Sequence, residues 1–286
     1  MPASLSRITP PRVLACLALA AGGAAAQENF TRNIMITGYW PPTNGMVRQF
    51  STSPVQNPGG WQGGNWNNSG YNVHSFFPEF PSPPNPPTAW GQGEGDFEID
   101  YQDTMADWER IVAEVNPVAI ITFSRGFPGS NWEVEGRLRM RSILQWGNDY
   151  EVPLRPSADM PIFDDLVPNT WYDSTLPTEA IRDAVADANV VDNSYIDMGG
   201  GGAFLSEFIG LLGARHQLLN GGPDAEFRTF AAGHIHVGID TPEGAASQAT
   251  EITLNELTAY LDTVIPAPGG AVLLAAAGAG LLRRRR

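Results

Sequence analysis

The chain has 286 residues, with 17 basic residues, all arginine, against 31 acidic ones, so its formal net charge is −14. Six of the arginines lie in the first 26 and last 22 residues, which hold no acid. The remainder therefore has 11 basic against 31 acidic residues, a net charge of −20. Such a charge repels phosphate backbones, which argues against a nucleic-acid partner.

The N-terminus has the three parts of a secretory signal peptide. Arg7 and Arg12 precede an apolar run at 13–20, and small residues lead to Ala24-Ala25-Ala26. We expect residues 1–26 to be removed on export. A lipoprotein signal at Cys16 is an alternative that fits poorly, because the apolar run continues beyond it. Cys16 is the single cysteine, so the mature protein is expected to have no thiol and no disulfide.

Residues 27–264 are expected to form one domain of alternating strands and helices. Strands are expected at 33–39, 71–77, 118–123, 137–146, 194–198 and 232–239. Helices are expected at 96–115, 177–189, 203–219 and 246–263. Residues 41–70 and 78–95 are rich in Pro and Gly and are expected to be loops. This order predicts an α/β fold of three αβα layers, with a mainly parallel twisted sheet between helices.

The start of the first expected long helix is open to two interpretations. Its acids suit the positive end of a helix dipole. The alternation Asp96, Glu98, Asp100 also resembles a short calcium-binding loop, an alternative that we consider weaker.

The sharpest local pattern is a strand followed by Gly199–Gly202 and then a helix. Backbone amides at a helix start can stabilise an anion, including an oxyanion, and Ser206 falls in the first turn. A simpler interpretation is a tight glycine turn followed by a solvated serine. A phosphate loop is not predicted, because no Gly-Lys-Ser/Thr follows.

Two histidines and two glutamates lie on or beside expected strands. Residues two apart on a strand share a face, so His234 and His236 could bind a metal together with an acid such as Asp240. Alternatively, one histidine could be a general base and the other structural. Glu133 or Glu135 could polarise a histidine, or both could be solvated.

Four segments, in chain order, resemble pyroglutamyl-peptidase I, the pyrrolidone-carboxylate peptidase family. Residues 34–39 (Ile-Met-Ile-Thr-Gly-Tyr) resemble its opening strand, and 172–177 (Tyr-Asp-Ser-Thr-Leu-Pro) resemble its Tyr-x-Ser-Thr-Leu-Pro. Residues 201–206 (Gly-Gly-Ala-Phe-Leu-Ser) resemble the nucleophile segment Ala-Gly-Thr-aromatic-aliphatic-Cys. Residues 232–237 (Ala-Gly-His-Ile-His-Val) resemble Ala-Gly-Phe-Ile-His-Val, which carries the catalytic histidine.

This resemblance implies a Cys-His-Glu/Asp type of hydrolase that removes N-terminal pyroglutamyl residues. It places Ser206 at the nucleophile position, His236 at the base and Glu135 at the orienting acid, with Glu133 as the rival for that role. The implied substrate-binding residues are Tyr39, Trp40, Gly201 and Gly202.

The chain departs from the family pattern at three places. The family's Glu-Pro-Phe-Gly-Gly run, which helps to form the pyroglutamyl pocket, is replaced by residues 40–44 (Trp-Pro-Pro-Thr-Asn). The catalytic cysteine is replaced by Ser206, a weaker nucleophile unless a base activates it. Glu207 stands where the family has Asn, and a negative charge there opposes a developing oxyanion.

The C-terminus, residues 265–286, resembles a PEP-CTERM sorting signal. A short Pro motif at 265–268 precedes an apolar stretch at 269–282 and four arginines. This implies a transient or processed membrane segment, a sorting machinery as partner, and a location in the periplasm, the cell envelope or outside the cell. The alternative is a weak C-terminal membrane anchor.

Together these patterns predict an exported, serine-dependent peptidase or amide hydrolase of peptides or small amides, without a metal or other cofactor. One alternative is a catalytically inactive relative that acts as a binding module of the envelope, with Trp61 and Trp66 on its ligand surface. The other alternative is a metal-binding protein built on His234 and His236.

Overall fold

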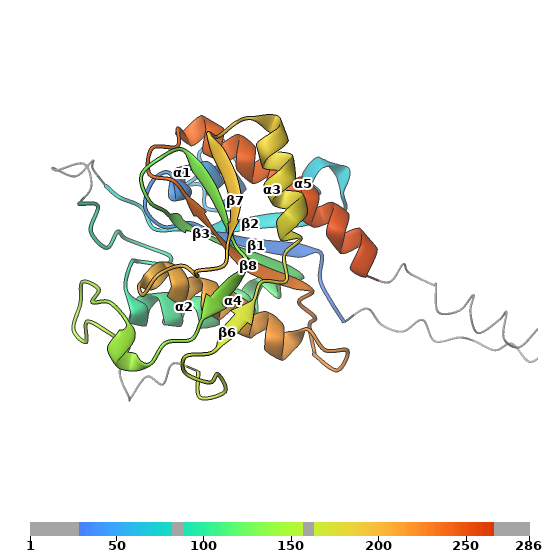
Figure 1. Cartoon of the computed structure of the whole chain (residues 1–286). Coiled ribbons are helices and arrows are strands. Elements are labelled where there is room, and N and C mark those ends of the chain that lie inside the picture. Colours follow the sequence, from blue (N-terminus) through green and yellow to red (C-terminus); the bar gives the residue numbers. More distant parts are fainter. Residues whose placement is uncertain (1–28, 82–88, 157–162, 266–286) are drawn as a thin grey trace, which may run out of the picture. The chain divides into compact units, whose positions relative to one another are not determined.

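A six-stranded mixed sheet organises the part of the chain that the computed structural model describes, residues 29–81, 89–156 and 163–265 (Figure 1). The strand order is β2-β1-β3-β8-β4-β7. The strands are β1 (Asn33–Thr37), β2 (Asn72–Phe76), β3 (Ala119–Arg125), β4 (Asn131–Glu135), β7 (Asn193–Asp197) and β8 (Ala231–Val237). All neighbouring pairs are parallel except β4 and β8. The predicted α/β class with a mainly parallel sheet is confirmed.

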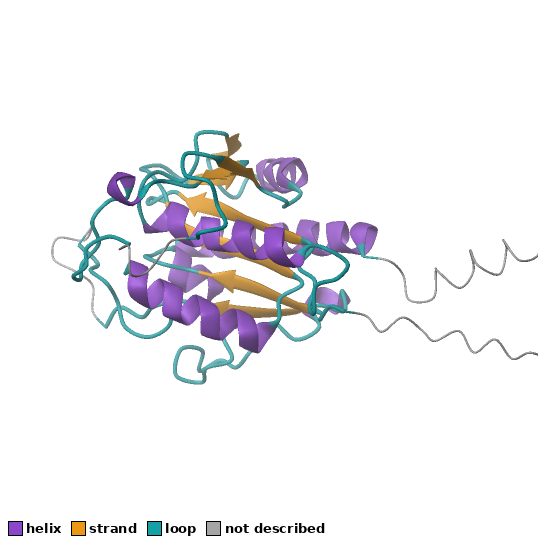
Figure 2. Cartoon of the chain, turned by 90° about the horizontal axis from the view of Figure 1, so that it is seen from below, coloured by secondary structure: helices purple, strands orange, loops and turns teal. Residues whose placement is uncertain are grey.

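Helices cover both faces of this sheet (Figures 1 and 2). One face carries α2 (Tyr101–Val115) and α4 (Leu205–Asn220), and the other carries α1 (Thr43–Val47), α3 (Thr178–Ala188) and α5 (Glu243–Val264). The three-layer arrangement therefore agrees with the prediction. No helix in the described part combines the length and apolar character needed to cross a bilayer.

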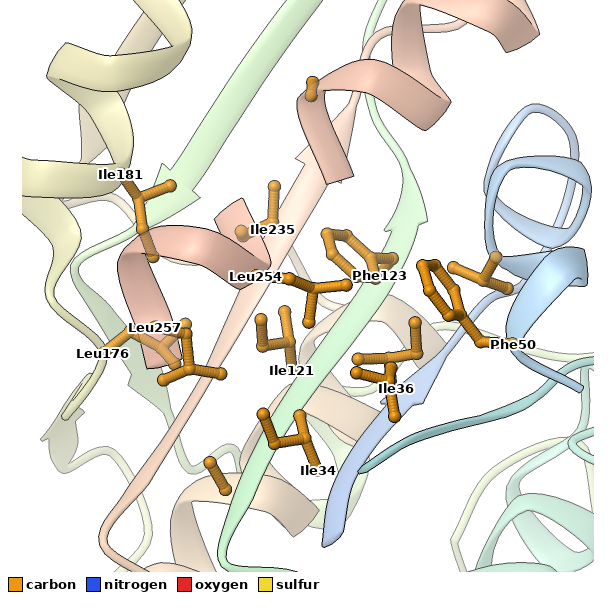
Figure 3. Packing of buried hydrophobic residues seen from close by; sticks show 14 of the residues in the cluster. Ile34, Ile36, Phe50, Ile121, Phe123, Leu176, Ile181, Ile235, Leu254 and Leu257 are labelled. Atoms are coloured by element: carbon orange, nitrogen blue, oxygen red, sulfur yellow. The ribbon is translucent and has the colours of Figure 1, made fainter. Parts of the chain in front are cut away.

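Strand β3 contributes to the packing on both faces because it is buried on both sides. Ile121 and Phe123 belong to the apolar cluster under α1, α3 and α5 (Figure 3), whereas Ile120 belongs to the cluster under α2 and α4. Strands covered on both faces need apolar side chains at successive positions. The run at 118–123 has this composition, which is why the sequence predicts the strand well.

Strand register brings polar side chains of three strands together on the α4 side. His236 of β8 lies opposite Ser124 of β3 and opposite Glu133 of β4. Ile235, between the two histidines, points to the opposite face and packs in the cluster of Figure 3. Alternation along β8 thus gives one apolar face and one face carrying His234 and His236.

The strand expected at 137–146 is wrong in its position. Strand β4 precedes it, and only Arg137–Arg139 forms a strand there, β5, which pairs with β6 (Trp171–Asp173) in a separate two-stranded sheet. A short 3₁₀ turn, η3 (Ile143–Gln145), follows. In β4 the apolar Trp132 and Val134 alternate with two buried glutamates, so the segment has the pattern of a strand with a solvated face.

Two other boundaries differ from the prediction. The loop expected at 41–70 contains α1 and two 3₁₀ turns, η1 (Arg48–Phe50) and η2 (Trp66–Asn68), because Met46, Val47 and Phe50 pack into the core. Helix α2 begins at Tyr101 instead of Asp96. The Asp100 side chain caps it by accepting a hydrogen bond from the Gln102 backbone N–H at 2.7 Å.

The carboxylates of the alternative calcium loop make protein contacts instead of converging. Asp100 caps α2, Asp96 pairs with Arg110, and Glu98 accepts a hydrogen bond from the Gly95 N–H. The predicted signal peptide at 1–26, the sorting tail after Ile265 and the middle of the loop expected at 78–95 lie outside the described residues.

Replacing Ile121 by alanine tests the packing of the central strand. Ile121 is completely buried in the cluster of Figure 3, so Ile121→Ala should lower the free energy of unfolding by about 2–5 kcal/mol. Denaturant titration measures this change. The control is Leu144→Ala, which should change stability by less than about 0.5 kcal/mol because Leu144 is 83% exposed. Equal effects of the two changes would contradict the assigned core.

Candidate active site

A buried histidine–glutamate pair lies at the centre of the site. Nδ1 of His236, on β8, is 2.7 Å from Oε1 of Glu135, on β4. Glu135 is completely buried and the His236 ring is 7% exposed. Nε2 of His236 makes no hydrogen bond to any described residue, which leaves the outer edge of the ring available for a reacting group.

The surroundings of this pair favour uncharged forms. Burial, followed by the neighbouring Asp197 and Glu207 carboxylates, raises the pKa of Glu135 to about 9. Burial also lowers the pKa of His236, and nearby carboxylates, Glu133 foremost, oppose this shift. Oε2 of Glu135 is buried without a hydrogen-bond partner among the described residues. Near neutral pH the carboxyl group therefore keeps its proton and donates it toward Nδ1.

This protonation state decides whether His236 can act as a base. A neutral imidazole whose Nδ1 accepts a hydrogen bond carries its own proton on Nε2. Only ionised Glu135, accepting a hydrogen bond from Nδ1–H, leaves a free electron pair on Nε2. The base-competent form of His236 thus requires the loss of the Glu135 proton.

Ser206, the predicted nucleophile, is the second residue of α4 and is half-buried. Its hydroxyl donates a hydrogen bond to the carbonyl oxygen of Gly201 at 2.9 Å and makes none to His236. The helix starts after Phe204, which provides no side-chain cap. The amides of the first turn are therefore without the side-chain partner that commonly satisfies them.

The glycine segment before α4 packs directly on His236. A Cβ atom on Gly201 would lie 3.0 Å from Cε1 of His236, closer than side chains normally pack. Gly200 and Gly202 have φ of +79° and +88°, a backbone conformation that favours glycine. The predicted glycine turn is present, and it places the helix bearing Ser206 beside the imidazole ring.

Glu207 is buried beneath the same segment, but its charge is compensated. Oε1 accepts a hydrogen bond from the Arg139 backbone N–H at 2.6 Å, and Oε2 forms an ion pair with Arg141 at 2.7 Å. Burial raises the pKa of Glu207, whereas the Arg139 N–H and Arg141 oppose this shift. Glu207 thus ties the start of α4 to β5 and the residues after it, a role that the sequence did not indicate.

His234 does not contribute a free nitrogen to the site. It is completely buried, with Nδ1 2.7 Å from Thr122 Oγ1 and Nε2 2.9 Å from Ser124 Oγ. Burial holds its pKa well below the ordinary value, so it is neutral. Its ring contacts that of His236 edge to face, at 4.6 Å between centroids. We conclude that His234 positions His236.

The metal set of His234, His236 and Asp240 is not brought together. Both nitrogens of His234 are occupied, and Asp240 accepts a hydrogen bond from the Gly129 N–H. A different set converges among the described residues: one ligand atom each of Glu133, Glu135 and His236 lies within 4.8 Å of the others. These oxygen and nitrogen donors suit Zn²⁺, although Nδ1 and Oε1 already bind each other.

The predicted substrate contacts separate into two groups. Tyr39 is buried, with its hydroxyl 2.8 Å from Thr104 Oγ1, so it belongs to the core beneath α2. Trp40 stacks on Phe204 at 6.2 Å between centroids, beside the start of α4. Trp40, Gly201 and Gly202 thus lie at or near the nucleophile segment, whereas Tyr39 does not.

The described fold is similar to solved structures of pyrrolidone carboxyl peptidases. The enzyme from Thermococcus litoralis matches with a TM-score of 0.54 and 18% sequence identity, over 83% of this chain and 100% of that chain. A mutant enzyme from Pyrococcus furiosus matches with a TM-score of 0.55 and 17% identity, over 80% of this chain and 99% of that chain. No protein-family model and no curated protein sequence matches the chain.

These comparisons define the core as an α/β domain with the fold of the pyrrolidone carboxyl peptidases. The family resemblance of the four sequence segments predicted this fold. At such low identity the similarity establishes architecture alone, so the roles of individual residues depend on the geometry described above.

The raised pKa of Glu135 predicts a pH-dependent stability. The unfolded chain loses this proton near pH 4.5 and the folded chain near pH 9, so stability from this group is complete below pH 4.5 and falls as pH rises toward 9. Glu135→Gln, which cannot ionise, should stabilise the protein at pH 8 by on the order of 1–3 kcal/mol and change it little at pH 4.5.

Denaturant titration at the two pH values measures the effect. Glu109→Gln on the exposed side of α2 is the control, and it should leave the pH profile of the native chain unchanged. If Glu135→Gln destabilised the protein equally at both pH values, the carboxyl group would be ionised in the fold.

Proposed function

We propose that this protein is an amide hydrolase of the pyroglutamyl-peptidase type, with Ser206 as nucleophile, His236 as general base and Glu135 as the residue that orients the base. The main observation behind this proposal is the 2.7 Å hydrogen bond between His236 Nδ1 and Glu135 Oε1. The glycine segment that leads into the helix of Ser206 packs against the same histidine. The fold shared with pyrrolidone carboxyl peptidases supports the same activity class.

The reaction would follow the usual order of acyl transfer. With Glu135 ionised, Nε2 of His236 takes the Ser206 proton while Oγ attacks the substrate carbonyl carbon. Free amides at the start of α4 stabilise the oxyanion. His236 then gives the proton to the leaving amine, and water, activated by the same ring, hydrolyses the acyl ester. The Ser206 hydroxyl must first give up its hydrogen bond to the Gly201 carbonyl.

We base the proposed substrate class on the shared fold and on the aromatic side chains beside the nucleophile helix. Pyrrolidone carboxyl peptidases take their name from a pyroglutamyl substrate, and we extend this substrate class to peptides and small amides here. Trp40 and Phe204 offer a planar apolar surface beside the nucleophile helix. From the signal peptide and sorting tail that the sequence predicts, we further propose that this activity is located in the periplasm, at the envelope or outside the cell, after contact with a sorting machinery.

Assays of the full chain on pyroglutamyl-arylamides and simple aryl esters test the nucleophile. Ser206→Ala and His236→Ala should each lower kcat/KM by at least about 10³-fold. Ser206→Cys should raise amide turnover, because a thiolate is the stronger nucleophile. Ser247→Ala is a matched control, since Ser247 also lies early in a helix and donates to a backbone carbonyl at 2.9 Å.

Two results would change the assignment. Undiminished turnover in Ser206→Ala would remove Ser206 from the mechanism. Absence of turnover in the native chain, with activity only in Ser206→Cys, would favour a non-catalytic binding module, consistent with a serine hydroxyl that bonds to Gly201. Loss of activity on chelation would assign Glu133, Glu135 and His236 to a metal instead.

The raised pKa of Glu135, about 9, also predicts the pH dependence of catalysis. The base-competent form appears as Glu135 loses its proton, so kcat/KM should rise between pH 7 and pH 9 with an apparent pKa near 9. Glu135→Gln should be slower and lack this rise. A plateau already reached at pH 7 would show that the carboxyl group is ionised in the active enzyme.

A further inference from the structure

Arg125 is exceptional among the eleven arginines of the described chain. Each of the other ten donates at least one side-chain hydrogen bond to a described residue. Arg125 makes neither a hydrogen bond nor an ion pair with any described residue. Although the chain has almost twice as many acids as bases, none of the described acids pairs with this guanidinium group.

This guanidinium group is held in place by aromatic rings. Its Cζ atom lies 4.7 Å from the centroid of Trp40. Trp40 in turn packs edge to face with Tyr150 at 6.4 Å and stacks on Phe204 at 6.2 Å. Its indole N–H donates to the Gly91 carbonyl at 2.7 Å, which fixes the ring. Arg125 is therefore supported on a rigid aromatic platform, while no acceptor in the described part of the chain takes a hydrogen bond from its N–H groups.

Partial burial makes this arrangement costly unless an anion completes it. Burial lowers the pKa of Arg125, which means that the charge is partly removed from water, although an arginine stays protonated. A charge withdrawn from water loses solvation energy, which the face of Trp40 offsets in part and which a carboxylate would restore more fully. No carboxylate of the described residues provides it, and the two buried acids of the candidate site are already paired, Glu135 with His236 and Glu207 with Arg141.

The position of Arg125 connects it to the candidate active site. Arg125 is the last residue of β3, and the next residue, Gly126, packs against His236. A Cβ atom added to Gly126 would lie 3.1 Å from Cβ of His236. On the other side, Trp40 stacks on Phe204, which is the residue directly before α4 and lies two positions before Ser206. The guanidinium group of Arg125 thus borders the region where His236 and the nucleophile helix meet.

We propose that Arg125 binds a carboxylate of the substrate, so that the preferred substrates are peptides or amides with an acidic group near the cleaved bond. A guanidinium group matches a carboxylate with two parallel N–H···O bonds, and the Trp40 ring holds the guanidinium group in position for them. The location of this subsite at a catalytic centre rests on the proposed function, whereas carboxylate binding itself does not.

Direct binding tests the subsite without catalysis. The probes are 4-acetamidobenzoate and its neutral analogue acetanilide, titrated into the full-length Ser206→Ala chain and followed by calorimetry and tryptophan fluorescence. The carboxylate should bind at least about 10-fold more tightly than the neutral probe. Arg125→Gln should remove this difference, and Arg125→Lys should retain part of it.

Arg228→Gln is the matched control, because Arg228 also lies over an aromatic ring, at 4.3 Å from Phe230, but donates to the Gly221 carbonyl. It should leave the preference for the carboxylate unchanged. Thermal unfolding of each variant checks that it is folded. The proposal would be overturned if the Ser206→Ala chain with Arg125 intact bound both probes with equal affinity. It would also be overturned if Arg228→Gln removed the preference for the carboxylate as Arg125→Gln does.

A second pair of compounds separates this proposal from the hydrolase proposal. Pyroglutamyl-4-aminobenzoate should have a higher kcat/KM than pyroglutamyl-anilide, and Arg125→Gln should reduce the ratio at least about 10-fold. Carboxylate-selective binding without turnover would support the subsite and refute the hydrolase. Turnover that does not depend on the carboxylate would support the hydrolase and refute the subsite.

Discussion

The antiparallel contact between β4 and β8 is the constraint on which the rest of the site depends. It makes β4 and its parallel neighbour β7 run opposite to the other four strands, and it brings Glu133 opposite His236, with Glu135 within hydrogen-bonding distance of the same ring. Because the helix layer of α2 and α4 removes water from this face, the pair must balance its charge with little solvent. The proton on Glu135 is the consequence, and it links the fold directly to pH.

Neighbouring groups adjust to this buried pair in different ways. Thr122 and Ser124 hold both nitrogens of His234, so the second imidazole remains neutral and rigid beside the first. Arg141 and a backbone amide neutralise Glu207, which would otherwise add an unpaired charge next to the glycine segment. The site is thus surrounded by polar groups whose hydrogen bonds are largely used within the protein.

The sequence predicts those features that depend on local pattern. A continuous run of apolar residues predicts β3. The segment around His236 predicts both a strand, β8, and the position of the candidate base. Strand β4 is harder to predict, because its two glutamates are buried in the structure although their charge indicates solvent exposure. The first turn of the 41–70 segment is helical owing to the core contacts of Met46 and Val47, which no local propensity reveals.

Other properties of the site depend on direction and distance in three dimensions. The sequence identifies Ser206 as a candidate nucleophile but not the hydrogen bond of its hydroxyl to Gly201. It groups Tyr39 with Trp40 as substrate contacts, whereas the strand places Tyr39 in the core and Trp40 beside α4. The isolation of Arg125 depends on where ten other arginines find their partners, information that a linear pattern does not contain.

Toward their C-terminal ends, β3 and β8 have one apolar and one polar face, and this division has a consequence for how the protein can change. Ile121, Phe123 and Ile235 contact the layer of α1, α3 and α5, while Thr122, Ser124 and His236 meet the opposite layer. Substitutions in the first layer can accumulate as compensating volume changes without touching the hydrogen bonds of the second. Divergence in stability and divergence in chemistry can therefore proceed on separate sides of one sheet.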